Sequence, residues 1–460
     1  MIKITSETAN NIRLRYDNRF SATYYHLAQQ MDTLNKQGVE IHTIADICKS
    51  IDSGSYIDEY VPTGTRYIRV GDLKKYVVDI SESAFIPSEK VKKKMILSKG
   101  DVCFARTQAT YDKLGNFTLI DDLNDGDSIS QHVSKIKPTK YVSSEYLVAY
   151  LNSKFGKKQM CIASYGDTRV ELTHNQTKEI KVILLDEDIV SIIEDKVKEM
   201  MECHNKANAA FKKSQDIIDK EFYGVEQNSF LSVTTKQMLI ENNLWSPTCY
   251  APKYVETINK IKNNFNSQKL SRLISFVKKG VEVGSDNYLI ELEKGPSDLP
   301  FIRTSDIYNN EIDYAPDYFV SQDRAIAAKC PELLIDDIIF SKDGKIGQVG
   351  IINEENSVVP SSGFAIMRSN GTVSSDYLFA ILSHKEIVVN QAKMKTVIAA
   401  TIPHLKIDKI NEFYIPIFSE SVISEIESNI RVFRENVSKK QQLIVEIQDV
   451  LNDSYSKLLR

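Results

Sequence analysis

The chain has 460 residues, a net charge of -4 and 42% hydrophobic residues, a composition typical of a globular protein of roughly two to four domains. The charge gives no overall signal for nucleic acid, although a local positive patch would suffice. Six cysteines without a CxxC pair argue against zinc and against a disulfide framework. The N-terminus lacks a signal-peptide core and no apolar run could cross a membrane, so we expect a cytoplasmic protein without membrane contact.

The first 185 residues are expected to form an α+β domain. A helix is predicted near Tyr24–Asn35. Short runs rich in β-branched and aromatic residues, bounded by Gly, Asp and Asn, then predict strands, and a short helix follows them. These strands and this helix are Tyr67–Val70, Val102–Ala105, Phe117–Ile120 and Glu145–Leu151. Such short elements indicate an irregular, mostly antiparallel sheet.

A long helix is predicted at residues 186–222, which contain no Gly or Pro. At ~1.5 Å per residue it would span roughly 55 Å. Its apolar residues recur at steps of three and four, a heptad-like spacing that favours packing against a partner helix. The expected seam is Val190, Ile193, Val197, Met200, His204, Ala207, Phe211 and Ile218.

A polar linker at residues 223–243 leads to a second α+β domain at residues 244–417 and to a second long helix at residues 418–460. The second domain should contain a helix near Tyr254–Asn264, strands at Phe301–Arg303, Ile338–Phe340 and Val349–Ile352, and a helix at Asp376–Leu382. The expected seam of the last helix is Ile423, Ile426, Ile430, Phe433, Val437, Lys440, Ile444, Ile447, Leu451 and Leu458. The polar seam residues His204 and Lys440 can set the register of a helix pair at some cost in stability. The alternative is two amphipathic helices, each lying on its own domain.

The two halves are predicted to be a tandem duplication. Five blocks recur in the same order, with an offset that starts at 234 residues between Ile68 and Ile302 and ends at 230 residues between His174 and His404. A period of half the chain is far too long for a solenoid. The matching blocks are Tyr67–Leu73 with Phe301–Ile307, Gly100–Arg106 with Asp336–Lys342, Lys113–Asn116 with Lys345–Gln348, Ser143–Leu147 with Ser374–Leu378, and His174 and Ile180 with His404 and Ile410.

Familiar catalytic motifs are absent from the sequence. It contains no GxxxxGK[ST] phosphate loop, GxGxxG turn, HExxH or GxSxG, and the seven histidines show no metal-ligand spacing. Asp336, Asp337 and Asp343 could form the carboxylate cluster of a metal-dependent nuclease. The first copy, however, has Gly100 and Thr107 at two of these positions, which is typical of turn residues.

Basic and polar residues on the loops between strands are the better functional signal. Arg and Lys suit phosphates and guanine edges, whereas Gln and Asn suit adenine. Each could equally be a solvated surface residue, Arg69 and Arg303 could pair with Asp72 and Asp306, and His174 and His404 are best explained as capping or core histidines. The candidate DNA-binding residues are Arg69, Lys92, Lys93, Arg106, Thr107, Gln108, Lys113 and Arg169 in the first copy and Arg303, Thr304, Lys342, Lys345 and Thr401 in the second.

Two segments of the second copy resemble a known family. Leu334–Ile351 and Thr401–Ile417 are similar to segments of the DNA-specificity (S) subunits of type I restriction-modification systems, and Leu244–Pro247 also has their character. The first copy is more divergent, with Phe104–Thr107 in place of Phe340–Asp343. The resemblance covers nearly the whole chain, since the order of domain, helix, domain, helix is shared.

The resemblance implies two tandem target recognition domains that each read one half of a split site in double-stranded DNA. The long helices would pair as an antiparallel coiled coil and set the distance between the half-sites. The chain itself would catalyse no reaction and bind no cofactor. Two methyltransferase (modification) subunits would dock on it, bind S-adenosylmethionine and methylate adenine N6 after flipping the base. Restriction or translocase subunits could join them to cleave DNA.

Three alternatives remain open at this point. The chain could be the specificity subunit of another methyltransferase-based anti-phage defence system. It could be a stand-alone metal-dependent nuclease that uses Asp337 and Asp343. It could also be a coiled-coil scaffold with no role on DNA.

Overall fold

The computed structural model describes residues 30–108, 114–164, 170–224, 240, 247–290, 293–398 and 403–458. Contacts divide the chain into two compact units. The first takes in Met1–Glu202 and Lys440–Arg460, and the second Cys203–Lys439. Residues 30–36 are helical, whereas the rest of the helix expected near Tyr24–Asn35 and most of the predicted linker lie outside the described residues.

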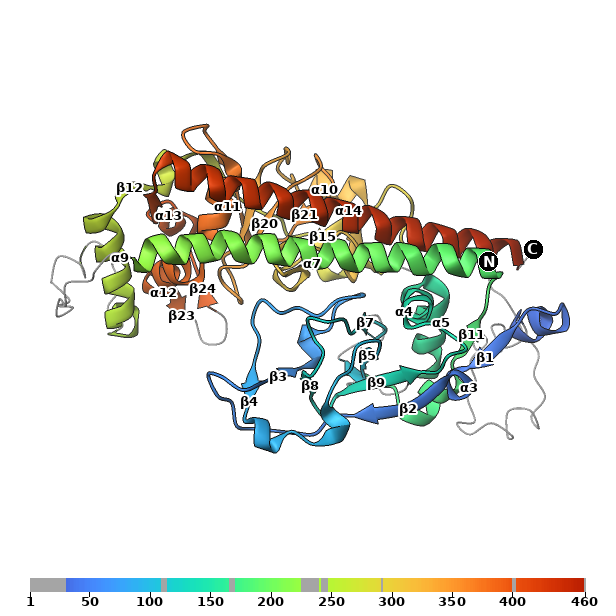
Figure 1. Cartoon of the computed structure of the whole chain (residues 1–460). Coiled ribbons are helices and arrows are strands. Elements are labelled where there is room, and N and C mark those ends of the chain that lie inside the picture. Colours follow the sequence, from blue (N-terminus) through green and yellow to red (C-terminus); the bar gives the residue numbers. More distant parts are fainter. Residues whose placement is uncertain are drawn as a thin grey trace. The chain divides into compact units, whose positions relative to one another are not determined.

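A four-stranded antiparallel sheet forms the centre of the first unit (Figure 1). Its strands, in spatial order, are β2 (Cys48–Ser53), β9 (Val133–Pro138), β5 (Val102–Ala105) and β7 (Phe117–Leu119). A second sheet contains β4 (Phe85–Ile86), β3 (Thr65–Ile68) and β8 (Ser128–Ile129), and the pair β3–β8 is parallel. Two small pairs join β1 (Ile41–Thr43) to β11 (Lys181–Ile183) and β6 (Thr107–Gln108) to β10 (Val170–Glu171). The helices are α3 (Ile44–Ile47), α4 (Ser144–Asn152), α5 (Lys154–Ala163) and α6 (His174–Glu179).

The second unit repeats this plan. Its central sheet has the order β13 (Ile274–Lys279), β22 (Phe364–Ser369), β19 (Ile338–Ser341) and β20 (Val349–Ile351). The second sheet contains β14 (Leu289–Ile290), β18 (Tyr318–Val320), β15 (Leu299–Ile302) and β21 (Val359–Pro360), with β15–β21 parallel. The small pairs are β12 (Asn266–Lys269) with β25 (Tyr414–Ile417), β16 (Ile307–Tyr308) with β17 (Glu311–Ile312), and β23 (Val397–Ile398) with β24 (Pro403–His404). The helices are α9 (Pro252–Asn264), α10 (Gln322–Ala327), α11 (Ser375–Leu382), α12 (Asn390–Lys395) and α13 (Ile407–Ile410).

The predicted α+β class is therefore confirmed, and most predicted elements are found within one or two residues of their expected bounds. The strand predicted at Tyr67–Val70 ends earlier, at Ile68, because a 3-10 turn begins at Val70. The Asp72 carboxylate accepts a hydrogen bond from the backbone N–H of Arg69 at 2.8 Å and closes that turn. The Asp72 side chain thus satisfies the backbone N–H of Arg69, which would otherwise need a carbonyl from a neighbouring strand.

Strand register confirms the duplication. Val102 lies opposite both Leu119 and Ile136 in the first unit. Ile338, in the second, lies opposite both Ile351 and Met367. Each central strand thus has the same two neighbours in the same register.

The equivalence proposed for His174 and His404 is wrong. The carbonyl of Ile180 accepts a hydrogen bond from the N–H of Ile44 at 2.9 Å, and the carbonyl of Phe413 accepts one from Leu270 at 2.7 Å. Ile180 therefore corresponds to Phe413, not to Ile410. By the same offset His174, the first residue of α6, corresponds to Ile407, the first residue of α13.

His404 instead corresponds to Glu171. Thr107 lies opposite Glu171, and Asp343 lies opposite His404. Isolated identities beside loops of unequal length cannot set an alignment, whereas strand pairing can.

The two predicted long helices are α7 (Glu187–Tyr223) and α14 (Glu420–Leu458). In each unit a segment of α7 lies beside a segment of α14 and runs in the opposite direction (Figure 1). In the first unit Lys196 Nζ lies 2.5 Å from Glu446 Oε2. In the second, the Phe211 and Phe433 ring centroids are 5.3 Å apart. No described helix has the length and apolar character needed to cross a membrane.

The predicted seams are largely the buried faces of these helices, and the polar His204 and Lys440 are buried within them. Near Ile444 the buried position is instead Leu443, and Ile444 is half-buried. The other seam residues that are only half-buried are Val190, Phe211, Ile423 and Leu458. A straight helix drifts relative to a seven-residue repeat, and this helix also packs against the domains rather than against its partner alone.

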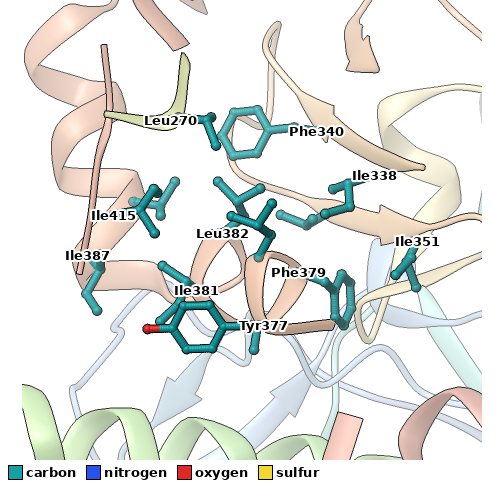
Figure 2. Packing of buried hydrophobic residues seen from close by; sticks show 14 of the residues in the cluster. Leu270, Ile338, Phe340, Ile351, Tyr377, Phe379, Ile381, Leu382, Ile387 and Ile415 are labelled. Carbon is teal, nitrogen blue, oxygen red and sulfur yellow. The ribbon is translucent and has the colours of Figure 1, made fainter. Parts of the chain in front are cut away.

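The main core of the second unit gathers around α11 (Figure 2). Its residues from Tyr377 to Leu382 are all buried, which explains why this helix is apolar on every side. The Tyr377 hydroxyl donates to the carbonyl of Pro416 at 2.7 Å. In the first unit Tyr146 of α4 donates to Ile183 at the same distance, so each copy ties this helix to its last strand.

We expect Phe379→Ala to lower the unfolding free energy by about 3–5 kcal/mol, the usual cost of deleting a buried ring. Phe379 is fully buried, and its ring centroid lies 6.0 Å from that of Phe211 on α7 and 5.7 Å from that of Phe433 on α14. Urea denaturation measures the change. Ile326→Ala is the control, since Ile326 is 68% exposed on α10 and its loss should cost less than about 0.5 kcal/mol. Equal effects would show that α11 does not anchor the helices.

We expect the second unit to lose stability as the pH falls below the ordinary histidine value of 6.5. Burial lowers the pKa of His384, and the neighbouring Asp219 only partly offsets this. Its Nδ1 accepts the Ile387 N–H at 3.2 Å, a role open only to an unprotonated nitrogen. A lowered folded-state pKa means that the unfolded chain binds the proton first, so stability is present above pH 6.5 and falls towards the folded pKa. His384→Asn should flatten the dependence of urea unfolding on pH between 7.5 and 5.5, whereas His42→Asn should leave it steep. An unchanged slope in His384→Asn would contradict this assignment.

Candidate nucleic-acid interface

In the first unit, the chain brings two of the predicted arginines to either side of one turn, residues 130–132. The N–H of Ser130 donates to the carbonyl of Ile68 at 3.0 Å, next to Arg69. The N–H of Arg106 donates to the carbonyl of His132 at 2.8 Å. Arg69 and Arg106, 37 positions apart in the sequence, are thereby set on the two flanks of the turn.

The second unit builds the same arrangement around residues 361–363. The N–H of Ser361 donates to Ile302 at 2.8 Å, and the N–H of Lys342 donates to Gly363 at 2.8 Å. Arg303 and Lys342 therefore flank this turn as Arg69 and Arg106 flank the first. We call the two turns, residues 130–132 and 361–363, the reading turns.

A glycine lies against each reading turn. A Cβ on Gly54 would lie 1.9 Å from the carbonyl oxygen of Ile129, and a Cβ on Gly280 would lie 2.2 Å from that of Ser361. No side chain fits at such distances, so only glycine lets the backbone after β2, or after β13, cross here. This crossing fixes the position of each reading turn.

The ion pairs left open by the sequence are present. Arg69 Nε and Nη2 lie 3.0 and 3.1 Å from the two oxygens of Asp72. Arg303 makes the same bidentate pair with Asp306 at 3.2 and 3.4 Å and lies 4.3 Å from the Tyr318 ring centre. Hydrogen bonding to Asp72 raises the pKa of Arg69. Both arginines are held in place by these contacts, and both remain partly exposed.

The second flank differs between the copies. Arg106 precedes β6, which consists of Thr107 and Gln108. Its Nη2 lies 3.3 Å from Oε1 of Glu171, the residue opposite Thr107 on β10. In the second unit Lys342 Nζ lies 2.5 Å from Asp343 Oδ2, and His404 Nδ1 lies 3.0 Å from Asp343 Oδ1. Both cations thus have a carboxylate neighbour, and these pairs carry different side chains on an equivalent backbone.

The remaining predicted residues lie on other turns and loops of the two units. Lys92 and Lys93 are exposed beside the 3-10 turn Lys93–Met95. Thr304 begins the 3-10 turn that ends at Asp306, beside Arg303. The carbonyl of Lys345 accepts a hydrogen bond from Ser341 Oγ at 2.5 Å, which places it in the loop after β19. Lys113, Arg169 and Thr401 lie outside the described residues.

The sequence analysis missed the polar residues of the reading turns, which are Ser130, Gln131, His132, Ser361 and Ser362. Gln131 is exposed, and its Nε2 lies 3.1 Å from His132 Nε2. Ser362 donates to Glu282 Oε1 at 2.8 Å. These residues stand apart from the basic side chains along the sequence, and only the alignment of Ser130 with Ser361 could have drawn attention to them.

His174 lies behind the first reading turn rather than on its surface. Its Nε2 is 2.8 Å from Ser53 Oγ and 3.2 Å from Ser134 Oγ. Burial, followed by the charge of Arg106, lowers the pKa of His174. A structural role was the favoured interpretation of this histidine, and these contacts support it.

The aspartates considered for a nuclease serve other purposes. Asp337 is fully buried, and both its oxygens accept hydrogen bonds from Arg368 at 2.7 Å. Asp336 has φ +75° where Gly100 has φ +85°, and it pairs with Arg434 at 2.6 Å. Within the described ranges, no group of three His, Cys, Asp or Glu side chains could hold a metal ion. These carboxylates are turn and ion-pair residues.

Comparisons with known proteins found a family model that agrees with the resemblance for the second copy. The sequence model of the "Type I restriction modification DNA specificity domain" matches residues 281–458, and no curated protein matches the chain. Among solved structures, the S subunit of a type I restriction-modification system from M. genitalium is 11% identical over 91% of this chain and 95% of its own, with a TM-score of 0.38. The HsdS subunit from Thermoanaerobacter tengcongensis is 15% identical over 91% and 96%, with a TM-score of 0.30.

Proposed function

We infer that the chain is the DNA-recognition subunit of a type I restriction-modification system, since residues 281–458 match the sequence model of the type I restriction modification DNA specificity domain. The observation that carries the inference to the first copy is the repeated reading turn. Both copies place it between an arginine held by an aspartate and a second basic residue. A chain with two such sites would read a bipartite target.

The proposed contacts follow from the chemistry of the flanks. Arginine and lysine beside an exposed loop suit phosphate oxygens and guanine edges, and hydroxyl and amide groups suit the other base edges. Arg69 and Arg303 are pinned, so they lose little side-chain entropy on binding. Because Lys92 and Lys93 are exposed and adjacent to Lys94, they suit the DNA backbone rather than base edges.

The long helices would hold the two half-sites apart. Helix α7 contains 37 residues and α14 contains 39, so each is roughly 55 Å long at ~1.5 Å per residue. One turn of DNA rises about 34–36 Å. A helix of this length can therefore connect two reading domains on one duplex.

The chemistry would belong to other subunits. We propose that two methyltransferase subunits dock on this chain, bind S-adenosylmethionine and methylate adenine N6, and that restriction subunits join this complex. This chain would then be non-catalytic, bind no cofactor and work in the cytoplasm on double-stranded DNA.

Mapping of methylated adenines tests the proposal directly. In cells that express this chain with the methyltransferase encoded beside it, we expect one split motif, with two short specific halves around a gap of fixed length. The same cells without this chain should lack that methylation. A single continuous motif would contradict two reading domains, and no motif would contradict the assignment.

We expect Arg106→Ala and Lys342→Ala each to impair recognition of one half-site only. Loss of a base or phosphate contact should cost about 1–3 kcal/mol of binding. In a binding assay with the assembled complex, altering one half-site of the DNA should lower the affinity of the two variants by different amounts. The reason is that each variant has lost contacts to a different half-site. Arg272→Ala is the control, because Arg272 is exposed in the 3-10 turn Leu270–Arg272 before β13 and far along the sequence from the reading turn. Equal loss at both halves in either variant would overturn the two-domain reading.

A further inference from the structure

The two copies carry different side chains on the same backbone arrangement. Comparing equivalent positions therefore distinguishes residues that build the site from residues that face the ligand. The residues that build it are the same in both copies. The crossing glycine is Gly54 or Gly280, the first residue of the turn is Ser130 or Ser361, and the pinned pair recurs as Arg–Asp. The glycine is required by the close approach of the backbone, and the Arg–Asp pair closes the 3-10 turn. The serine contributes a backbone N–H to the turn.

The tips of the reading turns differ completely. Gln131 corresponds to Ser362 and His132 to Gly363, because Ser130 and Ser361 make the same backbone bond. Gln131 is exposed, so packing does not dictate its identity. A Cβ at Gly363 would meet a methyl group of Thr304 at 3.1 Å, a tight contact that Thr304 would have to relieve by a small shift, and Ser361 Oγ at 3.6 Å. Both neighbours are side-chain atoms, so no backbone contact fixes glycine at this position.

Their hydrogen-bonding capacity suits base edges. The glutamine amide can bind adenine N6 and N7 with both its groups, and a histidine N–H can donate to a purine acceptor. The Ser362 hydroxyl donates a hydrogen bond to Glu282 Oε1 at 2.8 Å. A carboxylate can accept a hydrogen bond from the N4 amino group of cytosine. Each tip lies between two cations that would grip the phosphates, the arrangement that brings a side chain within reach of a base.

We propose that Gln131 and His132 read bases in the half-site of the first copy, and that Ser362 with Glu282 reads bases in the half-site of the second. This inference rests on the proposed function and assigns specificity within it. The two copies would grip DNA alike and differ in sequence preference at the tips of the reading turns.

The test exchanges the tips. The double variant Gln131→Ser/His132→Gly carries the residues of the second copy on the first turn. Methylation mapping with the intact complex should then show a relaxed or altered base at one or two positions of one half-site, with the other half and the gap unchanged. Loss of one bidentate contact corresponds to roughly 5- to 150-fold lower discrimination at that base. Gln37→Ser, at an exposed glutamine in the turn before β1, should leave the motif unchanged.

A binding assay covers the case in which the double variant no longer supports methylation. Competition among duplexes that each carry one altered base pair in the first half should show discrimination lost at one or two positions, with binding to unrelated DNA retained. Uniform loss across all duplexes would overturn the inference. So would an unchanged motif in the double variant. The proposed function fails separately, if the wild-type complex yields no split motif.

Discussion

At Gly54 the backbone passes so close to the carbonyl of Ile129 that a side chain has no room, and Gly280 repeats the crossing against Ser361. In the first unit this close approach places the end of β2 against the end of the parallel β3–β8 pair. In the second unit it places the end of β13 against the end of the parallel β15–β21 pair. The reading turn leaves from that point, and its hydrogen bonds to Ile68 and Arg106, or to Ile302 and Lys342, join the two sheets. The spacing of the basic side chains around the turn depends on this one contact.

The arginine–aspartate pairs show how one side chain can close a turn and still leave part of its charged group exposed. Burial raises the pKa of Asp72, and the hydrogen bonds from Arg69 oppose that shift. A buried carboxylate of this kind needs its partner, because an uncompensated charge is costly. The arginine side chain, however, is 43% exposed in Arg69 and 24% exposed in Arg303. Each arginine can therefore stabilise its turn with one edge while part of the side chain stays open to solvent.

Polar residues in the helix seam have a comparable double character. His204 of α7 is buried within the second unit, and its Nδ1 lies 3.7 Å from Oε1 of the buried Glu311. Burying such groups contributes little net stability, and replacement by apolar residues is often tolerated. Their value lies in specificity, because a polar seam position disfavours alternative registers of a helix pair. For a subunit proposed to measure distance along DNA, register is the property that matters.

The sequence by itself determined the features that depend on neighbouring residues and on periodicity. The two long helices, most strands, the helices at α4 and α11 and the tandem duplication were all predictable, because apolar spacing and local composition carry them. Arg69 and Arg106 were predictable as basic loop residues, although not as members of one site. Only the tertiary structure decided which residues meet across the sheets. It placed Gln131 between those arginines, matched His404 with Glu171 rather than with His174, and buried Asp337 against Arg368. The contacts that establish these placements join residues at least 25 positions apart in the sequence. Such pairings are decided by strand register and close packing, which leave no local signature in a single chain.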